Sequence, residues 1–538
     1  MLYKVKETFA NFYNEVVIHA TSIFCTVYLF AILIIIIGIT SDMTFTTDHA
    51  PYQYKDYPFF YLLAIPLVIY AIKKVADKVH IHVDYKIALI VMTAIQFIII
   101  GIYAGGLYAD PAYCLYAARG ILGEERSRFY SVNYIAAYPY QSAYIIFLSL
   151  FYKFFGYFDF LIYKLCCVLM YGWTLYFIGQ VFRFFLKEEY TEIIDLALVL
   201  FLPGWLIIEF GYNDIPGLFF TVLGFYCLIK SDGKYGAGLL AAILTGIGLS
   251  LRNNYLILFL AFTFASIPKE NKKSIFLFFI ETLIIYKLIN NGAYAYVNYI
   301  FPEIKKNEWD YPVTRWLYIG MQQSTTGAGY WAPDTAVDSG SGQLLAERMK
   351  EFAKKPTELL RFMALKMANT YSMPDFEGFD SFRYKNTLFI NGLATKSFLY
   401  LRGTLYDAIY KLLDIFHVIL IVGNLSWLFT EKKKDPGKMF GFIYFIGVAL
   451  FYTAWEIKAR YIVFGILFLI PTGILGIKKL VEKEYNKKEI MTIVLITIVI
   501  IFLSFIARDV IVNDPANIEK VSNVNNLMKE YYGKSKWD

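Results

Sequence analysis

Residues 108–156 read YADPAYCLYAARGILGEERSRFYSVNYIAAYPYQSAYIIFLSLFYKFFG. This stretch follows an apolar run at 86–104 that is long enough to cross a bilayer. It opens with a carboxylate, Asp110, and continues into two amphipathic stretches that are rich in Tyr and Phe. Aromatic side chains are favoured at the membrane–water boundary. The pattern therefore predicts an acidic residue just outside a membrane, beside helices that lie along its surface.

The whole chain has the composition of a membrane protein. Of its 538 residues, 58% are hydrophobic and 19% are aromatic. Long apolar runs recur without the alternation of a β-barrel, so we expect an all-α polytopic membrane protein. The net charge is +7, and because the Lys clusters sit between apolar runs they indicate cytoplasmic loops, not nucleic-acid binding. The five Cys form no CxxC motif, which gives no sign of a zinc site or a disulfide framework.

Fourteen apolar runs can be read from the sequence, and the lysine-rich connectors between them fix a topology. With those connectors on the cytoplasmic side, Asp110, Asp214 and Asn253 all fall outside. Both ends of the run at 142–155 also fall outside, so this run should lie along the interface as a helix. About thirteen runs are then left to cross the membrane. The N-terminus is expected in the cytoplasm and the tail after Ile506 outside.

This topology divides the chain into six parts. They are N-terminal transmembrane helices (1–104), an external loop with surface helices and Asp110 (105–158), a transmembrane module (159–290), a large external loop (291–403), C-terminal transmembrane helices (404–506) and an external tail (507–538). The large loop is the longest connector, and connectors of this length usually carry function or disorder. Its many aromatic residues favour an ordered subdomain against the membrane.

Asp110 is the first candidate for chemistry. As a general base it would take a proton from an acceptor hydroxyl. It would equally serve as the N-cap of the helix that follows it, and the two roles are compatible because a cap holds a carboxylate rigidly. Arg119 lies nine residues further on and would either face a lipid phosphate or belong to a solvated face.

Two other external turns carry candidate polar residues. Asn213 and Asp214 lie in a short turn between two runs, where Asn-Asp-x-Pro is also ordinary turn chemistry. Tyr138 precedes Pro139 at the start of the 142–155 helix, where it would contact a substrate or anchor the helix at headgroup depth. In the large loop, Tyr330 and Trp331 would form an aromatic sugar or lipid contact, or simply part of a turn.

Three cations fall near the outer ends of apolar runs: Lys164, Arg252 and Arg460. A phosphate at the outer leaflet needs cationic donors, and an Arg fork binds phosphate oxygens in bidentate fashion. The alternative for each is a long side chain that reaches the headgroups from within the bilayer. Asp110 has no DxD or ExD partner, so a divalent metal site is not indicated.

Several of these motifs together resemble the GT-C glycosyltransferases. The resemblance rests on Asp110-Pro-Ala-Tyr113, Ala118-Arg119-Gly120, Tyr138-Pro139, Phe155-Gly156, Tyr212-Asn213-Asp214, Leu251-Arg252-Asn253-Asn254, Trp316 with Gly320, and Arg460-Tyr461. The chain is most similar to the protein O-mannosyltransferase and aminoarabinose-transferase branch, in the form seen in low-GC Gram-positive bacteria. Two features depart from that pattern: two extra apolar runs precede the family's first helix, and Pro111 replaces the acid that would follow Asp110.

The resemblance implies a donor in which a monosaccharide is carried on polyprenyl phosphate, with undecaprenyl as the bacterial carrier. It implies that Asp110 matches the catalytic acidic residue of the family's first loop, and that no metal or other cofactor is needed. From their positions, we expect Arg252 and Arg460 near the donor phosphate, with Lys164 as a further candidate. The expected reaction is inverting, extracytoplasmic transfer to a hydroxyl on a surface glycan, a teichoic-acid-like polymer or a glycolipid. Membrane lipid is the other expected partner, and nucleic acid is not.

The main alternative is a transporter of lipid-linked sugars that breaks no bond. Such a transporter predicts ionisable residues at mid-membrane and repeated halves. Few such residues and no internal repeat occur here, whereas charged positions collect at the external ends of the runs. The pattern therefore favours the enzyme, while a purely structural partner of another glycosyltransferase is a third reading.

Overall fold

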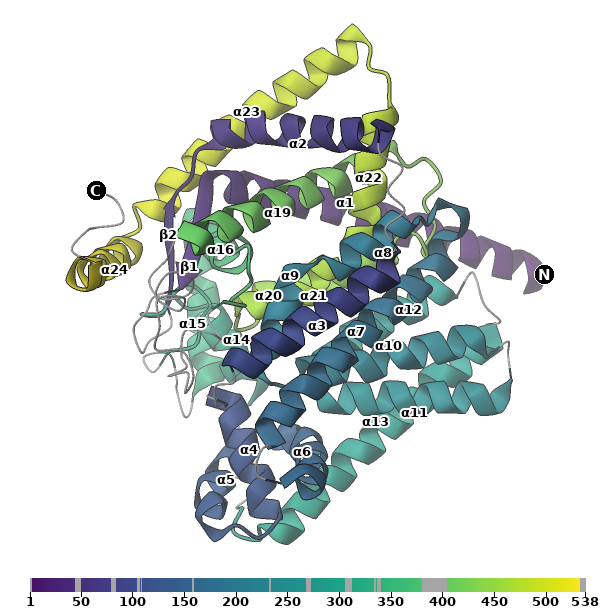
Figure 1. Ribbon diagram of the computed structural model, residues 1–538, viewed down its shortest axis with the longest axis vertical. Coiled ribbons are helices and arrows are strands. Elements are labelled where there is room, and N and C mark those ends of the chain that lie inside the picture. Colours follow the sequence, from purple (N-terminus) through teal and green to yellow (C-terminus); the bar gives the residue numbers. More distant parts are fainter. Residues whose placement is uncertain are drawn as a thin grey trace.

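The computed structural model describes residues 2–43, 50–78, 84–103, 107, 109–156, 159–231, 234–267, 272–304, 312–332, 335, 340–379 and 404–532. These residues form a bundle of α-helices with one antiparallel hairpin of strands, β1 (Ile39–Met43) and β2 (Pro51–Lys55) (Figure 1). The helical character agrees with the all-α prediction. The hairpin is an addition that the apolar runs do not indicate.

The bounds of the helices are as follows. The N-terminal half holds α1 (Leu2–Gly38), α2 (Pro58–Lys78), α3 (Tyr85–Tyr103), α4 (Ala109–Ile121), α5 (Glu125–Ala137), α6 (Ser142–Phe155), α7 (Asp159–Leu186), α8 (Glu192–Val199), α9 (Leu202–Leu206), α10 (Asp214–Lys230), α11 (Tyr235–Leu251), α12 (Leu256–Ser266) and α13 (Lys272–Ile300). The C-terminal half holds α14 (Val313–Gly320), α15 (Ser341–Lys354), α16 (Pro356–Tyr371), α19 (Thr404–Thr430), α20 (Phe440–Ala454), α21 (Val463–Leu467), α22 (Ile470–Glu482), α23 (Lys487–Val512) and α24 (Pro515–Tyr532).

Five helices of the described chain are long and apolar enough to cross a membrane: Glu15–Gly38, Phe160–Glu189, Lys272–Ile300, Tyr406–Thr430 and Lys487–Val512. A bent pair, Glu192–Val199 with Leu202–Phe210, would make a sixth if it acts as one span. The prediction of about thirteen spans is therefore not confirmed. Several apolar runs form helices that are too short to cross alone, because polar or Gly-containing breaks interrupt them. The run at 461–478, for example, is divided between a 3₁₀ turn, α21 and α22.

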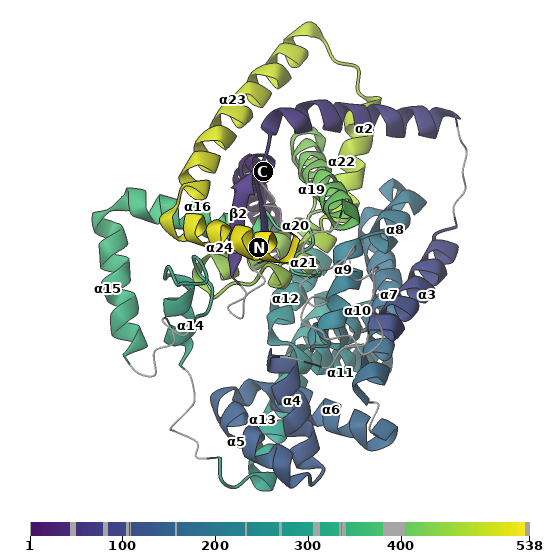
Figure 2. The same ribbon diagram turned by 60° about the vertical axis from the view of Figure 1, so that its left-hand side comes forward.

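The connectors gather at two opposite ends of the bundle. α19 shows this best, because it begins beside the hairpin, where the Tyr410 hydroxyl donates to the Ser41 carbonyl, and ends beside Glu431. Glu431 pairs with Lys438 and Lys479, so the lysine-rich connectors meet at this end. The hairpin, α4–α6, α14–α16 and α24 lie toward the other end (Figure 1 and Figure 2). The topology predicted from the connectors, and the side of the membrane that each end faces, stay predictions.

Close packing of α10 against α11 brings two polar turns together. A Cβ on Gly248 would lie 2.3 Å from the Thr221 Oγ1 atom, and one on Gly224 would lie 2.2 Å from the Thr245 Oγ1 atom. Small residues of this kind let the backbones of membrane helices approach closely. Because the two helices are antiparallel neighbours, the start of α10 and the residue after α11, Arg252, lie side by side.

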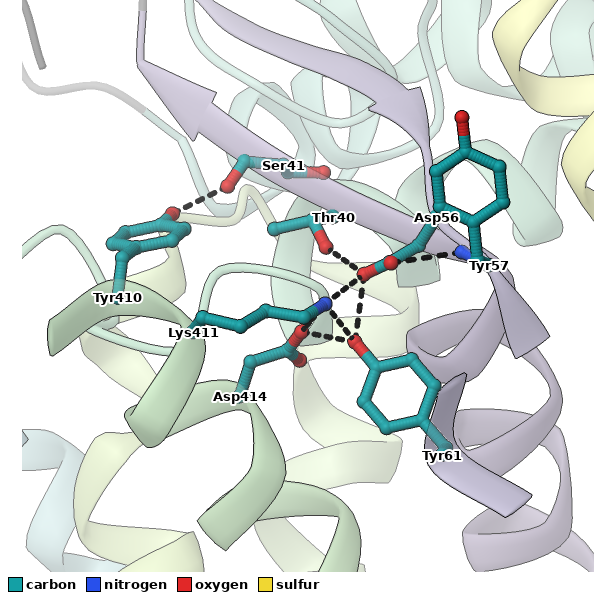
Figure 3. A network of polar contacts seen from close by, with 8 residues as sticks. All are labelled: Thr40, Ser41, Asp56, Tyr57, Tyr61, Tyr410, Lys411 and Asp414. Atoms are coloured by element: carbon teal, nitrogen blue, oxygen red, sulfur yellow. Dashed lines mark hydrogen bonds and ion pairs between the residues drawn. The ribbon is translucent and has the colours of Figure 1, made fainter. Parts of the chain in front are cut away.

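A buried polar network fastens the N-terminal helices to α19. It comprises Thr40, Asp56, Tyr61, Lys411 and Asp414, called here the Lys411 network (Figure 3). The Lys411 Nζ atom lies 2.6 Å from the Asp56 Oδ2 atom and 3.0 Å from the Asp414 Oδ2 atom. Thr40 and Tyr61 each donate to Asp56 over 2.6 Å. The N-terminal helices α1 and α2 are thus held to α19 by charge as well as by apolar packing.

Candidate active site

Asp110 lies in the first turn of α4, directly after a residue with unusual backbone geometry. Ala109 has a φ of +51°, in the left-handed region that residues with a Cβ rarely adopt. Such a conformation costs on the order of 1–3 kcal/mol and persists only where the surroundings impose it, often at functional sites. The positive end of the α4 dipole also favours a carboxylate at this position.

Five groups from three other parts of the chain act on the Asp110 carboxylate. Together with Asp110 they are called here the Asp110 cluster: Tyr134 on α5, Arg252 after α11, and Glu456, Lys458 and Arg460 after α20. Burial raises the pKa of Asp110, while the charges of Arg460, Arg252 and Lys458 act in the opposite direction. Tyr134 also donates a hydrogen bond to the carboxylate. The predicted base and two of the three predicted cations therefore lie in one site.

Arg252 is held by the Asn213–Asp214 turn. Its Nε atom lies 3.0 Å from the Asp214 Oδ1 atom, and its Nη1 atom donates to the Asn213 Oδ1 atom over 3.3 Å. Asn213 in turn donates to the Leu251 carbonyl over 2.8 Å, which fixes the turn to the end of α11. The guanidinium lies 5.4 Å from the ring centres of both Tyr212 and Tyr461. Asn213 and Asp214 thus orient Arg252 through their side chains.

Arg460 is held by Glu377, an acid of the large loop. The Arg460 Nη1 atom lies 3.0 Å from the Glu377 Oε2 atom. The other oxygen, Oε1, accepts hydrogen bonds from the Tyr330 hydroxyl over 2.7 Å and from the Ala459 amide over 2.8 Å. Glu377 has a φ of +63° and its neighbour Phe376 a φ of +52°, so a second strained segment supports the site. Tyr330 therefore lies behind the site, where it positions Glu377.

Aromatic rings line the side of the cluster formed by α5. The Tyr134 ring stacks on Tyr113 with centres 5.3 Å apart, and it lies 4.8 Å from the ring of Tyr138. Tyr138 also contacts Trp316 of α14, with ring centres 6.1 Å apart. The predicted contact residue Tyr138 therefore packs against Tyr134, the residue that forms a hydrogen bond with Asp110. The large loop reaches the first external loop through Trp316.

Three predicted site residues lie differently. Lys164 donates to the Glu209 Oε1 atom over 2.9 Å, and neither side chain has any exposed surface, so its charge already serves a buried ion pair. Arg119 lies in the last turn of α4, at the opposite end of the helix from Asp110. Trp331 is 40% exposed, and its carbonyl accepts a hydrogen bond from Thr326.

Four residues of the site are not among the candidates predicted from the sequence: Tyr134, Glu377, Glu456 and Lys458. Glu377 gives no local signal, because its partners lie about 50 and 80 residues away along the chain. Glu456, Lys458 and Arg460 do give one, because charges at every second position after an apolar helix share one face of an extended segment. The segment from Glu456 to Lys458 is not helical, in agreement with that spacing.

The site combines a carboxylate that is able to take a proton with cations that are able to hold an anion. Burial raises the pKa of Glu456 to about 7, with Lys458 and Arg460 acting against this and Asp110 and Glu377 adding to it. Within the described residues, no group of three or more His, Cys, Asp or Glu side chains is arranged to hold a metal ion. Independence of metal stays an expectation.

Comparison with known proteins gives no family assignment. No family model and no curated protein matches the chain. Among solved structures, the chain is similar to the archaeal oligosaccharyltransferase AglB from Archaeoglobus fulgidus in complex with an inhibitory peptide and a dolichol-phosphate, with a TM-score of 0.33 and 12% identity. It is also similar to the apo form of the Archaeoglobus fulgidus oligosaccharyltransferase, with a TM-score of 0.34 and 11% identity. Both matches cover 83% of this chain but only 58% of the other, and TM-scores this low do not establish a shared fold.

Proposed function

We propose that this membrane protein is a glycosyltransferase of the GT-C type that moves a monosaccharide from polyprenyl phosphate to an acceptor hydroxyl. The observation that carries the proposal is the meeting of Asp110 with Arg252 and Arg460 in one site. A transfer of this kind needs a base for the acceptor and cations for a phosphate that gains charge as it leaves. The five long apolar helices and the sequence resemblance support a lipid-borne donor.

In the proposed reaction, Asp110 takes the proton of the acceptor hydroxyl as its oxygen attacks the anomeric carbon. The bond between that carbon and the phosphate oxygen breaks from the opposite face, so the configuration inverts. The lipid phosphate leaves with the bonding electron pair, and Arg252 and Arg460 stabilise its added charge. Arg252 has five N–H donors in all, and its contacts with Asp214 and Asn213 use two of them.

We place the reaction at the extracytoplasmic face of the cell membrane, with the N-terminus in the cytoplasm. The support is the grouping of lysine-rich connectors at the end of the bundle opposite the Asp110 cluster, since such connectors are mostly cytoplasmic. Undecaprenyl phosphate is the proposed carrier. A surface glycan, a teichoic-acid-like polymer or a glycolipid is the proposed acceptor.

The test is a transfer assay with purified protein in lipid nanodiscs. Labelled undecaprenyl-phosphate monosaccharides would be supplied with candidate acceptors, and labelled product would be counted. Asp110→Asn should lower the rate about 10²-fold or more, the scale of losing a general base, with little change in stability. Glu124→Gln, an exposed acid in the same loop, is the matched control and should keep the wild-type rate.

Two results would contradict the proposal. One is unchanged transfer by Asp110→Asn. The other is movement of labelled lipid across the bilayer of sealed vesicles without cleavage of the sugar bond, which would indicate the transporter. A separate experiment tests on which side of the membrane the first loop lies. A membrane-impermeant maleimide should label the Glu124→Cys variant in intact cells.

A further inference from the structure

Among the described residues, Glu456 differs from the other acids of the site in having no hydrogen-bond or ion-pair partner. The Asp214 carboxylate is paired with Arg252, and the Glu377 carboxylate is held by Tyr330, Ala459 and Arg460. Glu456 is only 6% exposed, yet its carboxylate forms no hydrogen bond and no ion pair with any residue in the described part of the chain. A buried polar group without a partner is costly, so it calls for an explanation.

The carboxylate oxygens of Glu456 are not completely enclosed by the protein. Neither oxygen is among the side-chain atoms that are both fully enclosed by protein and without a hydrogen-bond partner. The carboxylate is therefore surrounded by protein on most sides and keeps a small accessible area. A ligand group that reaches this accessible area would supply the missing hydrogen bond.

The backbone around Glu456 is fixed without help from its carboxylate. The Lys366 Nζ atom donates to the Trp455 carbonyl over 2.8 Å, and the Ile457 amide donates to the Gly329 carbonyl over 2.9 Å. On the other side, a Cβ on Gly320 would lie 2.3 Å from the carbonyl carbon of Trp455, so α14 packs directly against this segment. The backbone of this segment is held from three directions, and none of these contacts uses the Glu456 carboxylate.

Glu456 lies within electrostatic range of tyrosine hydroxyls as well as of charged groups. The ionisable groups that it influences or that influence it are Asp110, Tyr140, Lys366, Glu377, Tyr452, Lys458, Arg460 and Tyr461. The Tyr452 and Tyr461 rings stack on each other with centres 5.3 Å apart and 25° between their planes. An acid beside aromatic rings is suited to a polyhydroxylated ligand, because the carboxylate accepts hydrogen bonds from hydroxyls while the rings cover carbon surface.

We infer that Glu456 accepts a hydrogen bond from a hydroxyl of the sugar that the lipid phosphate carries, and so determines which sugar is bound. This inference rests on the proposed function, since it assigns a sugar subsite to the same donor. The phosphate is assigned to the neighbouring Arg252 and Arg460 instead, because their guanidinium groups stay charged and bind phosphate oxygens in bidentate fashion. Asp110, in contrast, serves the acceptor.

The experiment measures binding, so that it does not depend on transfer. Wild-type protein in nanodiscs is titrated with undecaprenyl phosphate and with its glucosyl, galactosyl, mannosyl and N-acetylglucosaminyl forms. At least one sugar-bearing lipid should bind more tightly than the bare lipid phosphate. Glu456→Ala should reduce that preference about tenfold or more, the scale of a hydrogen bond to a charged group. Its affinity for the bare lipid phosphate should stay as in wild type.

Two further variants separate recognition from folding. Glu456→Gln keeps an acceptor oxygen and should keep part of the preference. Arg252→Ala should weaken the bare lipid phosphate and the sugar-bearing lipids equally. The inference is overturned if wild type shows no preference for any of the four sugars, or if both Glu456 variants keep the full preference. A preference that depends on Glu456, in a protein that moves lipid-linked sugar without cleaving it, would keep this inference and end the proposed function.

Discussion

The Asp110 cluster and the Lys411 network contain the same kinds of side chain and use them in opposite ways. In the Lys411 network, one cation lies within 3.0 Å of two carboxylates, and Thr40 and Tyr61 supply further donors (Figure 3). In the Asp110 cluster, by contrast, Glu456 has no hydrogen-bond or ion-pair partner among the described residues, and Asp110 accepts a hydrogen bond from Tyr134. A buried charged group whose hydrogen bonds are all made within the protein indicates a structural role. One that lacks hydrogen-bond partners within the protein indicates a ligand-binding role.

The ionisation of the acids differs in the same sense. Burial by itself would raise the pKa of Asp56, but the Lys411 charge and hydrogen bonds from Lys411, Thr40 and Tyr61 lower it overall. In Asp110, burial outweighs three nearby cations and the pKa is raised. The first acid is kept permanently charged by its partners. The second is poised to exchange a proton, as a base must be.

Removal of the cation of the Lys411 network is expected to have the largest effect on stability. Lys411→Met should lower the free energy of unfolding by about 3 kcal/mol, because it leaves Asp56 and Asp414 buried beside each other. Thermal unfolding in detergent measures this loss. The transfer rate per folded molecule should stay at the wild-type value, and a stable but inactive variant would show that the network belongs to the active site.

Arg252→Lys tests the opposite case, in which function should suffer more than stability. An ammonium cannot keep both the Asp214 and Asn213 contacts while lying between two rings. The KM for the lipid donor should rise about tenfold, as expected when one charge-assisted hydrogen bond is lost. Donor titration at fixed acceptor measures it, and an unchanged KM would remove Arg252 from the donor site.

The pH dependence of transfer sharpens the assignment of the base. Activity should fall as the pH is lowered, with a midpoint above the ordinary Asp value of about 3.9, because burial raises the pKa of Asp110. Arg460 lowers that pKa, so Arg460→Gln should move the midpoint to higher pH. The profile of kcat/KM against pH reports both. A midpoint that moves to lower pH in this variant would contradict the electrostatic picture.

The smallest expected effect concerns Thr40. Thr40→Val removes one of several donors to Asp56 and should cost about 1 kcal/mol of stability. Transfer should not change. A loss as large as that of Lys411→Met would mean that the network acts as one inseparable unit, which a double-mutant cycle of the two changes would measure.

The sequence predicts the meeting of Asp110, Arg252 and Arg460 for a simple physical reason. Each lies where an apolar run ends, and the lysine-rich connectors assign these ends to one side. The number of spans is not predictable in the same way, because breaks such as the turn before α21 depend on packing. Glu377 and Lys411 escape prediction because their partners are distant in the chain.

Two hydrogen bonds between the hairpin and α24 determine when this end of the protein is able to fold during synthesis. The Gln53 amide donates to Asn517 over 2.7 Å, and Asn517 donates back to the Gln53 carbonyl over 2.9 Å, across 464 positions of the chain. At about 5–20 residues per second, a ribosome needs roughly 20 to 90 seconds to add the missing partner. Until then the outer face of β2 is an unprotected strand edge. Assembly of this end of the protein is therefore completed only after Asn517 has been synthesised.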